Sequence, residues 1–185
     1  MTTRNILKIY RSASPEQVEA GMTWYFRAHD LAVELAGDSA IGAGVIAALS
    51  PNCSWDQNVV MARRAFDTGV VSGTFGDAER KAQAILDGGD PREILGGRKV
   101  RSFFENIVDP SNPVPVTVDR HSYDLSMGAR SQNDKRPAIG KRKYAELTEY
   151  HYRAAKIMGV MPHQIQAVTW ERWRQMWAWR KTAAA

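Results

Sequence analysis

Signals that start and stop helices recur along the whole 185-residue chain, and they constrain its fold more than any other feature. Ser14 and Ser54 each precede a glutamine by three positions, the spacing of a capping box at a helix N-terminus. Asp38, Asp77 and Asp90 are likewise placed to cap helix starts. Glycine or proline ends most of the segments that follow. The helices predicted in this way cover residues 14–36, 38–49, 54–67, 77–86, 98–108, 119–127, 143–158 and 162–180, with a short turn after residue 90.

No stretch alternates apolar and polar residues for long enough to predict a sheet. Residues 112–118 are expected to be extended, because they contain Pro113 and Pro115. We therefore predict an all-α, compact multi-helix domain with a short extended loop before the helix that Asp119 begins. We expect a single helical domain over residues 1–185. The alternative is two interleaved lobes, a central one of about residues 38–127 and a terminal one of about 1–37 plus 128–185.

Composition excludes several classes of protein. The single cysteine, Cys53, leaves no disulfide framework and no four-cysteine metal site. The four histidines are scattered without a second ligand at zinc spacing, so we expect no metal. There is no phosphate-binding loop of the Walker type, and no cofactor is expected. No apolar run approaches the ~20 residues of a membrane helix, and no signal-like segment follows Met1, so we expect a cytoplasmic protein.

The net charge of +5 and the pI of about 9.5 are compatible with a polyanionic partner. Residues 130–143 hold six cationic side chains against the single carboxylate of Asp134. Two smaller basic clusters lie at residues 63–64 and 98–101. Each cluster is either a contact surface for nucleic acid or an ordinary solvated face.

Three segments resemble the helix-hairpin-helix DNA glycosylase superfamily, the endonuclease-three-like enzymes, over about residues 40–127. Residues 44–56 (GVIAALSPNCSWD) resemble its apolar helix ending in Leu-Ser, with the polar loop that reaches into DNA. Residues 116–121 (VTVDRH) resemble its Val-Asp-x-His loop, which carries the catalytic aspartate. Residues 95–100 (LGGRKV) resemble the end of its hairpin, although the family reads Leu-Pro-Gly-Val-Gly before the basic residues. Residues 98–108 could instead match the helix that precedes the hairpin. Small stand-alone relatives of this kind resemble phage-encoded proteins.

The resemblance implies that Asp119 is the catalytic carboxylate. Breaking an N-glycosidic bond builds positive charge on the deoxyribose, which a fixed carboxylate stabilises while it orients the attacking water. Asp119 could also be no more than a helix cap. Lys99 corresponds to the lysine of bifunctional family members, and it would form a Schiff base if Arg98 and Arg101 favoured its neutral form. A solvated lysine is the alternative.

Further residues are candidates for DNA contacts. Side chains of the loop after residue 49 would fill the gap left by a flipped base or stack on it. His121 would bind phosphate or orient the aspartate loop. The candidate DNA-binding residues are Asn52, Ser54, Trp55, Gln57, Gly96, Gly97, Arg98, His121, Lys141, Arg142 and Lys143. Trp170, Trp173 and Trp177 follow a helical spacing that is more typical of packing than of base stacking.

The resulting hypothesis is a DNA-glycosylase-like hydrolase that acts on a base in double-stranded DNA, with Asp119 as its catalytic carboxylate. One alternative keeps the scaffold as a DNA-binding module without turnover. Another is a phage enzyme that modifies thymine-derived bases. A third is a protein-interaction module that uses the Trp-rich last helix.

Overall fold

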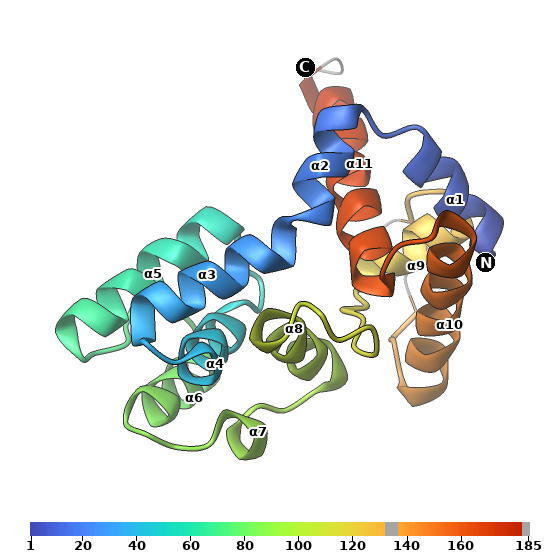
Figure 1. The fold of residues 1–185 in the computed structure, drawn as a ribbon. Helices are drawn as coiled ribbons and strands as arrows, with labels where there is room; N and C mark the ends of the chain where they lie inside the picture. The colour runs from blue at the N-terminus through green and yellow to red at the C-terminus, as the bar shows by residue number, and fades with distance from the viewer. Residues whose placement is uncertain (132–136, 183–185) are drawn as a thin grey trace. The chain divides into compact units, whose positions relative to one another are not determined.

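All the regular secondary structure in the described part of the chain is helical. The computed structural model describes residues 1–131 and 137–182, and within them eleven helices and no strand are found. The predicted all-α fold is therefore confirmed (Figure 1). The helices are α1 Thr3–Arg11, α2 Pro15–Met22, α3 Trp24–Ala36, α4 Ser39–Leu49, α5 Trp55–Thr68, α6 Gly76–Leu86, α7 Pro91–Ile94, α8 Arg98–Val108, α9 Arg120–Met127, α10 Lys141–Met158 and α11 Pro162–Thr182.

Side-chain caps start several of these helices where the sequence predicts them. The Ser14 hydroxyl accepts a hydrogen bond of 3.3 Å from the Gln17 backbone N–H, and the Gln17 amide oxygen accepts one from the Ser14 N–H. The same reciprocal pattern joins Ser54 and Gln57 at α5. Asp38 accepts from two backbone N–H groups at the start of α4. Each cap satisfies N–H groups that have no partner inside the helix.

Three features differ from the sequence prediction. The predicted helix over residues 14–36 breaks at Thr23, whose hydroxyl and N–H both bond the Glu19 carbonyl, and it forms α2 and α3. Asp77 does not cap α6, because that helix begins one residue earlier, after Phe75. Helix α1 was not predicted at all. It is capped by the Thr2 hydroxyl, which accepts from the N–H of Asn5.

The chain divides into two compact units, and its N-terminal segment belongs with its C-terminal part. Unit 1 comprises residues Met1–Tyr25 and Pro113–Ala185, and unit 2 comprises Phe26–Asn112. These boundaries differ from the lobes expected from sequence, which placed α9 in the central lobe. Helix α9 lies in unit 1, because Leu125 packs on Ile9 and Trp173 and the Ser126 carbonyl accepts from Asn5.

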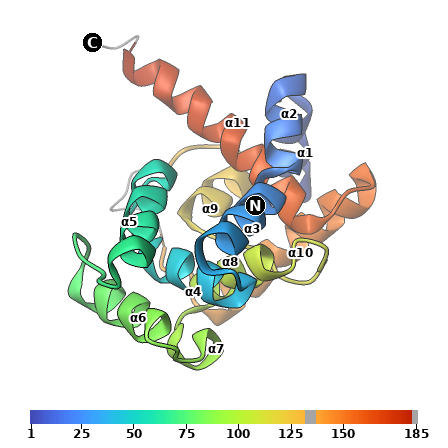
Figure 2. The ribbon, with the colours of Figure 1, turned by 60° about the vertical axis from the view of Figure 1, so that its left-hand side comes forward.

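Unit 2 is built around α4. Every residue of α4 from Gly42 to Leu49 is buried, as expected of a helix that is apolar on all sides. Helices α5, α6, α7 and α8 contact it, and both ribbon views show α4 among them (Figures 1 and 2). Gly42 allows a close approach of α3, because a Cβ there would lie 2.1 Å from the Ala32 carbonyl oxygen.

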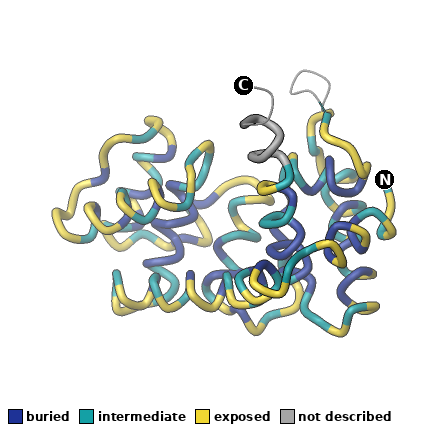
Figure 3. The backbone as a smooth tube through the Cα atoms, turned by 90° about the horizontal axis from the view of Figure 1, so that it is seen from above, coloured by how far each residue is buried: buried dark blue, intermediate teal, exposed yellow. Residues whose placement is uncertain are grey.

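Unit 1 packs α1, α2, α9 and α10 against α11. Ile165 and Val168 of α11 lie in a buried cluster with Ile6 and Leu7 of α1. Figure 3 colours the backbone by burial, with buried residues in dark blue and exposed ones in yellow. Trp173 of α11 is buried against Ile9 and Leu125. Its role in packing therefore follows the expectation for the tryptophan stripe. The side chain of Trp177 lies outside the described residues.

Candidate functional site

The segment that leads to Asp119 is held by tyrosine hydroxyls instead of a sheet partner. The Tyr144 hydroxyl of α10 donates a hydrogen bond of 2.7 Å to the Val116 carbonyl. The same hydroxyl accepts one of 3.2 Å from the Val118 N–H. The Tyr152 hydroxyl, two turns further along α10, donates to the Val114 carbonyl. The side chains of Val116 and Val118 are buried against Leu147, which lies between Tyr144 and Tyr152 along α10. The position of the next residue, Asp119, is therefore tied to α10.

Asp119 is the N-cap residue of α9, and all the described hydrogen bonds of its carboxylate go to one of the two oxygens. Oδ1 accepts from the His121 N–H at 2.8 Å and from the Ser122 N–H at 3.0 Å. The Ser122 hydroxyl donates to the same oxygen at 3.3 Å and accepts from the Asp119 N–H at 3.2 Å. No described hydrogen bond reaches Oδ2. The half-buried carboxylate is thus fixed through one oxygen, and its second oxygen is not engaged by the described residues.

His151 of α10 is fully buried and lies within range of the charge on Asp119. Its Nδ1 is 2.8 Å from the Leu147 carbonyl oxygen, and since a carbonyl can only accept, this nitrogen carries the proton. Among the described residues Nε2 has no hydrogen-bond partner. Burial lowers the pKa of His151, and the negative charge of Asp119 opposes that shift. Neither Tyr144 nor His151 is among the site residues predicted from the sequence. Their spacing with Leu147 along one helix face was the available signal.

The other predicted residues of unit 1 lie at helix starts. His121 is half-buried in the first turn of α9, and its backbone N–H bonds Asp119. Lys141 and Arg142 are exposed in the first turn of α10, which has no side-chain cap and no acidic residue there. Lys143 forms an ion pair of 2.8 Å with Glu146. Lys135 and Arg136 of the predicted basic loop lie outside the described residues.

In unit 2, the loop between α4 and α5 has an unusual backbone conformation. Asn52 has a φ of 56°, the left-handed region, and no other non-glycine residue in the described part of the chain does. Asn52 is exposed and Trp55 is half-buried. The side chains of Ser54 and Gln57 are engaged in the capping box of α5. A DNA contact by Ser54 or Gln57 would therefore have to share or replace a capping interaction.

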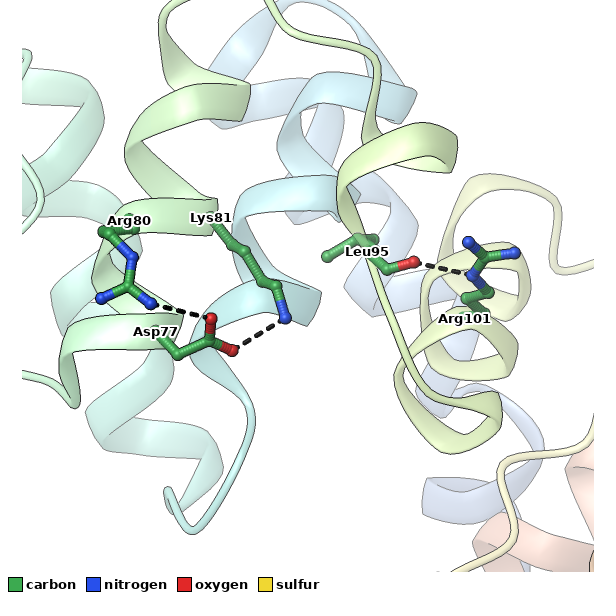
Figure 4. A network of polar contacts seen from close by, with 5 residues as sticks. All are labelled: Asp77, Arg80, Lys81, Leu95 and Arg101. Carbon is green, nitrogen blue, oxygen red and sulfur yellow. Dashed lines mark hydrogen bonds and ion pairs between the residues drawn. The ribbon is translucent and has the colours of Figure 1, made fainter.

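Two of the predicted residues, Asn52 and Gly96, line one pocket of about 220 Å³ in unit 2. Asp77 and Lys81 of α6 also line it, and sequence analysis did not connect them with this site. Lys81 donates to Asp77 at 2.8 Å, and this hydrogen bond is the main reason why the pKa of Asp77 is lowered. Figure 4 shows this ion pair on α6 with Leu95 on a neighbouring segment.

Helices α7 and α8 are joined by Leu95, Gly96 and Gly97, where the family hairpin would lie. Gly97 has a φ of 74° and precedes α8 without a side-chain cap. Arg101 donates a hydrogen bond of 2.7 Å from Nε to the Leu95 carbonyl, which braces the connection (Figure 4). Arg98 and Lys99 are exposed in the first turn of α8. An uncapped helix start with cations beside it suits an anion such as phosphate.

Lys99 lies in unit 2 and Asp119 in unit 1. Within the described residues, no group of three histidine, cysteine or acidic side chains is placed to hold a metal ion. None of the described helices is, by itself, long and apolar enough to cross a membrane.

These features define an all-α protein of two units, one of which is formed by a central segment of the sequence and the other by the two segments that flank it. A carboxylate is held at a helix start in the second of these. The chain belongs to a family of unknown function (DUF7178), whose model matches residues 1–176. No curated protein matches it, and no solved structure does.

Proposed function

We propose that this protein is a DNA-glycosylase-like enzyme that cleaves the N-glycosidic bond of a base in double-stranded DNA, with Asp119 as the catalytic carboxylate. The observation that carries the proposal is the geometry of Asp119. Oδ1 is fixed by the start of α9, Oδ2 is left for chemistry, and the preceding segment is tied to α10 by Tyr144. Residues 116–121 resemble the aspartate loop of the glycosylase superfamily, which adds support from sequence.

The chemistry follows from a fixed negative charge. When the bond between C1′ and the base nitrogen breaks, its electron pair leaves with the base and the sugar becomes cationic. The Asp119 carboxylate stabilises that charge, and it can orient the water that adds to C1′ and accept its proton. The backbone N–H groups that bond Oδ1 hold the carboxylate in one position, as this role requires.

The basic helix starts support DNA as the partner. Lys141 and Arg142 at α10, together with Arg98 and Lys99 at α8, place exposed cations beside helix N-termini without side-chain caps. Both cations and the positive end of a helix dipole attract phosphate. The pocket at Asn52 and Gly96 is a further candidate contact in unit 2.

The test uses a panel of duplexes, each with one damaged or modified base, followed by alkaline cleavage of abasic sites. On the best substrate, Asp119→Asn should lower the rate of base release by several orders of magnitude, at ~1.4 kcal/mol per tenfold. The matched control is Asp38→Asn. Asp38 caps α4 through the same pair of backbone bonds but lies in unit 2. Both variants should melt close to wild type, because asparagine caps nearly as well as aspartate.

Equal rates of base release in the two variants would show that Asp119 is only a cap. One observation favours a second function, a DNA-binding module without catalysis. The Leu95-Gly96-Gly97 connection is shorter than the corresponding hairpin of the DNA glycosylase superfamily. That function is supported if wild type binds duplex DNA and releases no base from any member of the panel.

A further inference from the structure

Helix α1 carries three cations along one face. Arg4, Lys8 and Arg11 are spaced four and three residues apart, so they follow one stripe of the helix, and all three are exposed. At 1.5 Å per residue, the stripe extends along about 10 Å of the helix axis. The opposite face is buried through Ile6, Ile9 and Tyr10.

These cations line a groove of about 660 Å³ on unit 1. Its apolar floor includes Leu7 of α1 and Ile157 of α10, and Ile157 is 58% exposed despite its apolar side chain. No acidic residue lines the groove. Ser12, which also lines the groove, accepts a hydrogen bond of 3.2 Å from Arg172 of α11.

No carboxylate in the described part of the chain neutralises the cations of this stripe. None of Arg4, Lys8 and Arg11 forms an ion pair with any described residue. Several cations elsewhere do pair, among them Arg63 with Glu34 and Arg153 with Glu149. Helix stability does not explain the whole stripe. Lys8 and Arg11 lie in the last turn, where the helix dipole favours cations, but Arg4 lies in the first turn, where it disfavours them.

We infer that this groove is a contact surface for the phosphodiester backbone of duplex DNA. Each strand of a duplex carries one phosphate per ~3.4 Å of the duplex axis, so a stripe about 10 Å long is comparable with the axial length of about three phosphates. The three cations then face the phosphates of one strand, and the apolar residues beside them contact the sugars. The inference rests on DNA as the partner in the proposed function, but not on catalysis by Asp119.

The experiment measures affinity for an unmodified duplex by fluorescence anisotropy over a series of salt concentrations. Each phosphate that a cation neutralises contributes about −0.9 to the slope of log affinity against log salt. Replacing Arg4, Lys8 and Arg11 together by glutamine should flatten the slope by about 0.9 for each phosphate that is no longer neutralised. The control replaces Arg80, Arg92 and Arg153 by glutamine, which removes the same charge from residues already paired with carboxylates. If the triple variant of Arg4, Lys8 and Arg11 has the same slope of log affinity against log salt as the control, the inference is wrong.

A single Arg4→Gln variant keeps the test decisive if the triple variant folds poorly, because it leaves the favourable cations of the last turn in place. It should flatten the slope by about 0.9. The inference and the proposed function fail separately. Base release without a change in slope refutes the groove alone. A flattened slope in a protein that releases no base refutes only the catalysis.

Discussion

The hydroxyl of Tyr144 donates a hydrogen bond of 2.7 Å to the carbonyl oxygen of Val116. This bond spans 28 positions of the chain and joins α10 to the extended segment before Asp119. The Tyr144 hydroxyl oxygen also accepts a hydrogen bond from the N–H of Val118. One side chain therefore satisfies a backbone donor and a backbone acceptor of the extended segment, groups that pair with a neighbouring strand in a sheet. The rigidity of the Asp119 loop thus depends on a residue distant in sequence.

Tyr144→Phe should lower the stability of the protein. It leaves the Val116 carbonyl and the Val118 N–H without this partner, at a cost of ~1–3 kcal/mol. The melting temperature should fall by about 2–4 °C per kcal/mol. The control is Tyr150→Phe, whose hydroxyl bonds the half-exposed Glu146 carboxylate of the same helix. Under the proposed function, base release should also slow more in Tyr144→Phe than in Tyr150→Phe. Equal melting temperatures in the two variants would contradict the prediction.

Lys141 and Arg142 should contribute more to DNA binding than Lys143. The first two are exposed at the start of α10, whereas Lys143 is already neutralised by Glu146 at 2.8 Å. We expect Lys141→Ala and Arg142→Ala each to flatten the salt dependence of duplex affinity by about 0.9. Lys143→Ala should change the slope less. If all three variants keep the wild-type slope, the start of α10 does not contact phosphate.

Gly42→Ala should destabilise the protein by ~1–3 kcal/mol, the usual cost of overpacking a filled core. The new Cβ would lie 2.1 Å from the Ala32 carbonyl oxygen, so α3 and α4 would have to move apart. Gly76→Ala is the control. Its Cβ meets only an Arg80 guanidinium nitrogen at 3.6 Å, and alanine in place of glycine within a helix gains at most ~1 kcal/mol. Chemical denaturation of both variants measures the difference, and equal stabilities would show that the close approach is not needed.

Local signals predicted much of the fold. The capping boxes at Ser14 and Ser54 depend on residues three positions apart, and both start helices as expected. Helix α1 was missed, because it is short and its burial depends on α10 and α11, which follow more than a hundred residues later. Asp77 was assigned as a cap, but its carboxylate pairs with Arg80 and Lys81 within α6. The sequence alone does not distinguish these two uses of an aspartate.

The candidate site was predictable only in part, for the same reason. Proline stiffening and the N-cap position located Asp119 correctly at the start of α9. The Tyr144 hydroxyl bonds and the complete burial of His151 depend on tertiary packing, which no local spacing around Asp119 reveals. The pocket in unit 2 likewise joins Asn52, Lys81 and Gly96 from three separate segments.

Lys99 should not form a covalent complex with DNA when the reaction is treated with borohydride. An amine must lose its proton to attack the sugar, and burial is a common way to favour the neutral form. Lys99 is exposed in the first turn of α8, and the connection before it differs from the hairpin of the DNA glycosylase superfamily. A strong adduct that Lys99→Ala abolishes would contradict this prediction.

Acid should destabilise the protein through the buried side chain of His151. Burial lowers the pKa of His151 below its ordinary value of 6.5, so below pH 6.5 the unfolded chain binds a proton that the folded protein does not. The contribution of neutral His151 to the free energy of unfolding is therefore complete above pH 6.5. It should decrease as the pH falls towards 5, by up to ~1.4 kcal/mol per pH unit. The pKa values of Glu34 and Glu146 are lowered from 4.5 by their partners, so these carboxylates titrate below this range.

Two variants separate His151 from other sources of pH dependence. His151→Gln removes the titrating group, so the melting temperature should change less between pH 7 and pH 5 than it does in wild type. Asp119→Asn removes the charge that raises the pKa of His151, so protonation becomes harder and the loss of stability should extend further into acid. The two substitutions thus act in opposite directions on the same curve. Melting temperatures measured at half-unit steps of pH test this, and parallel curves for all three proteins would show that His151 does not govern the acid sensitivity.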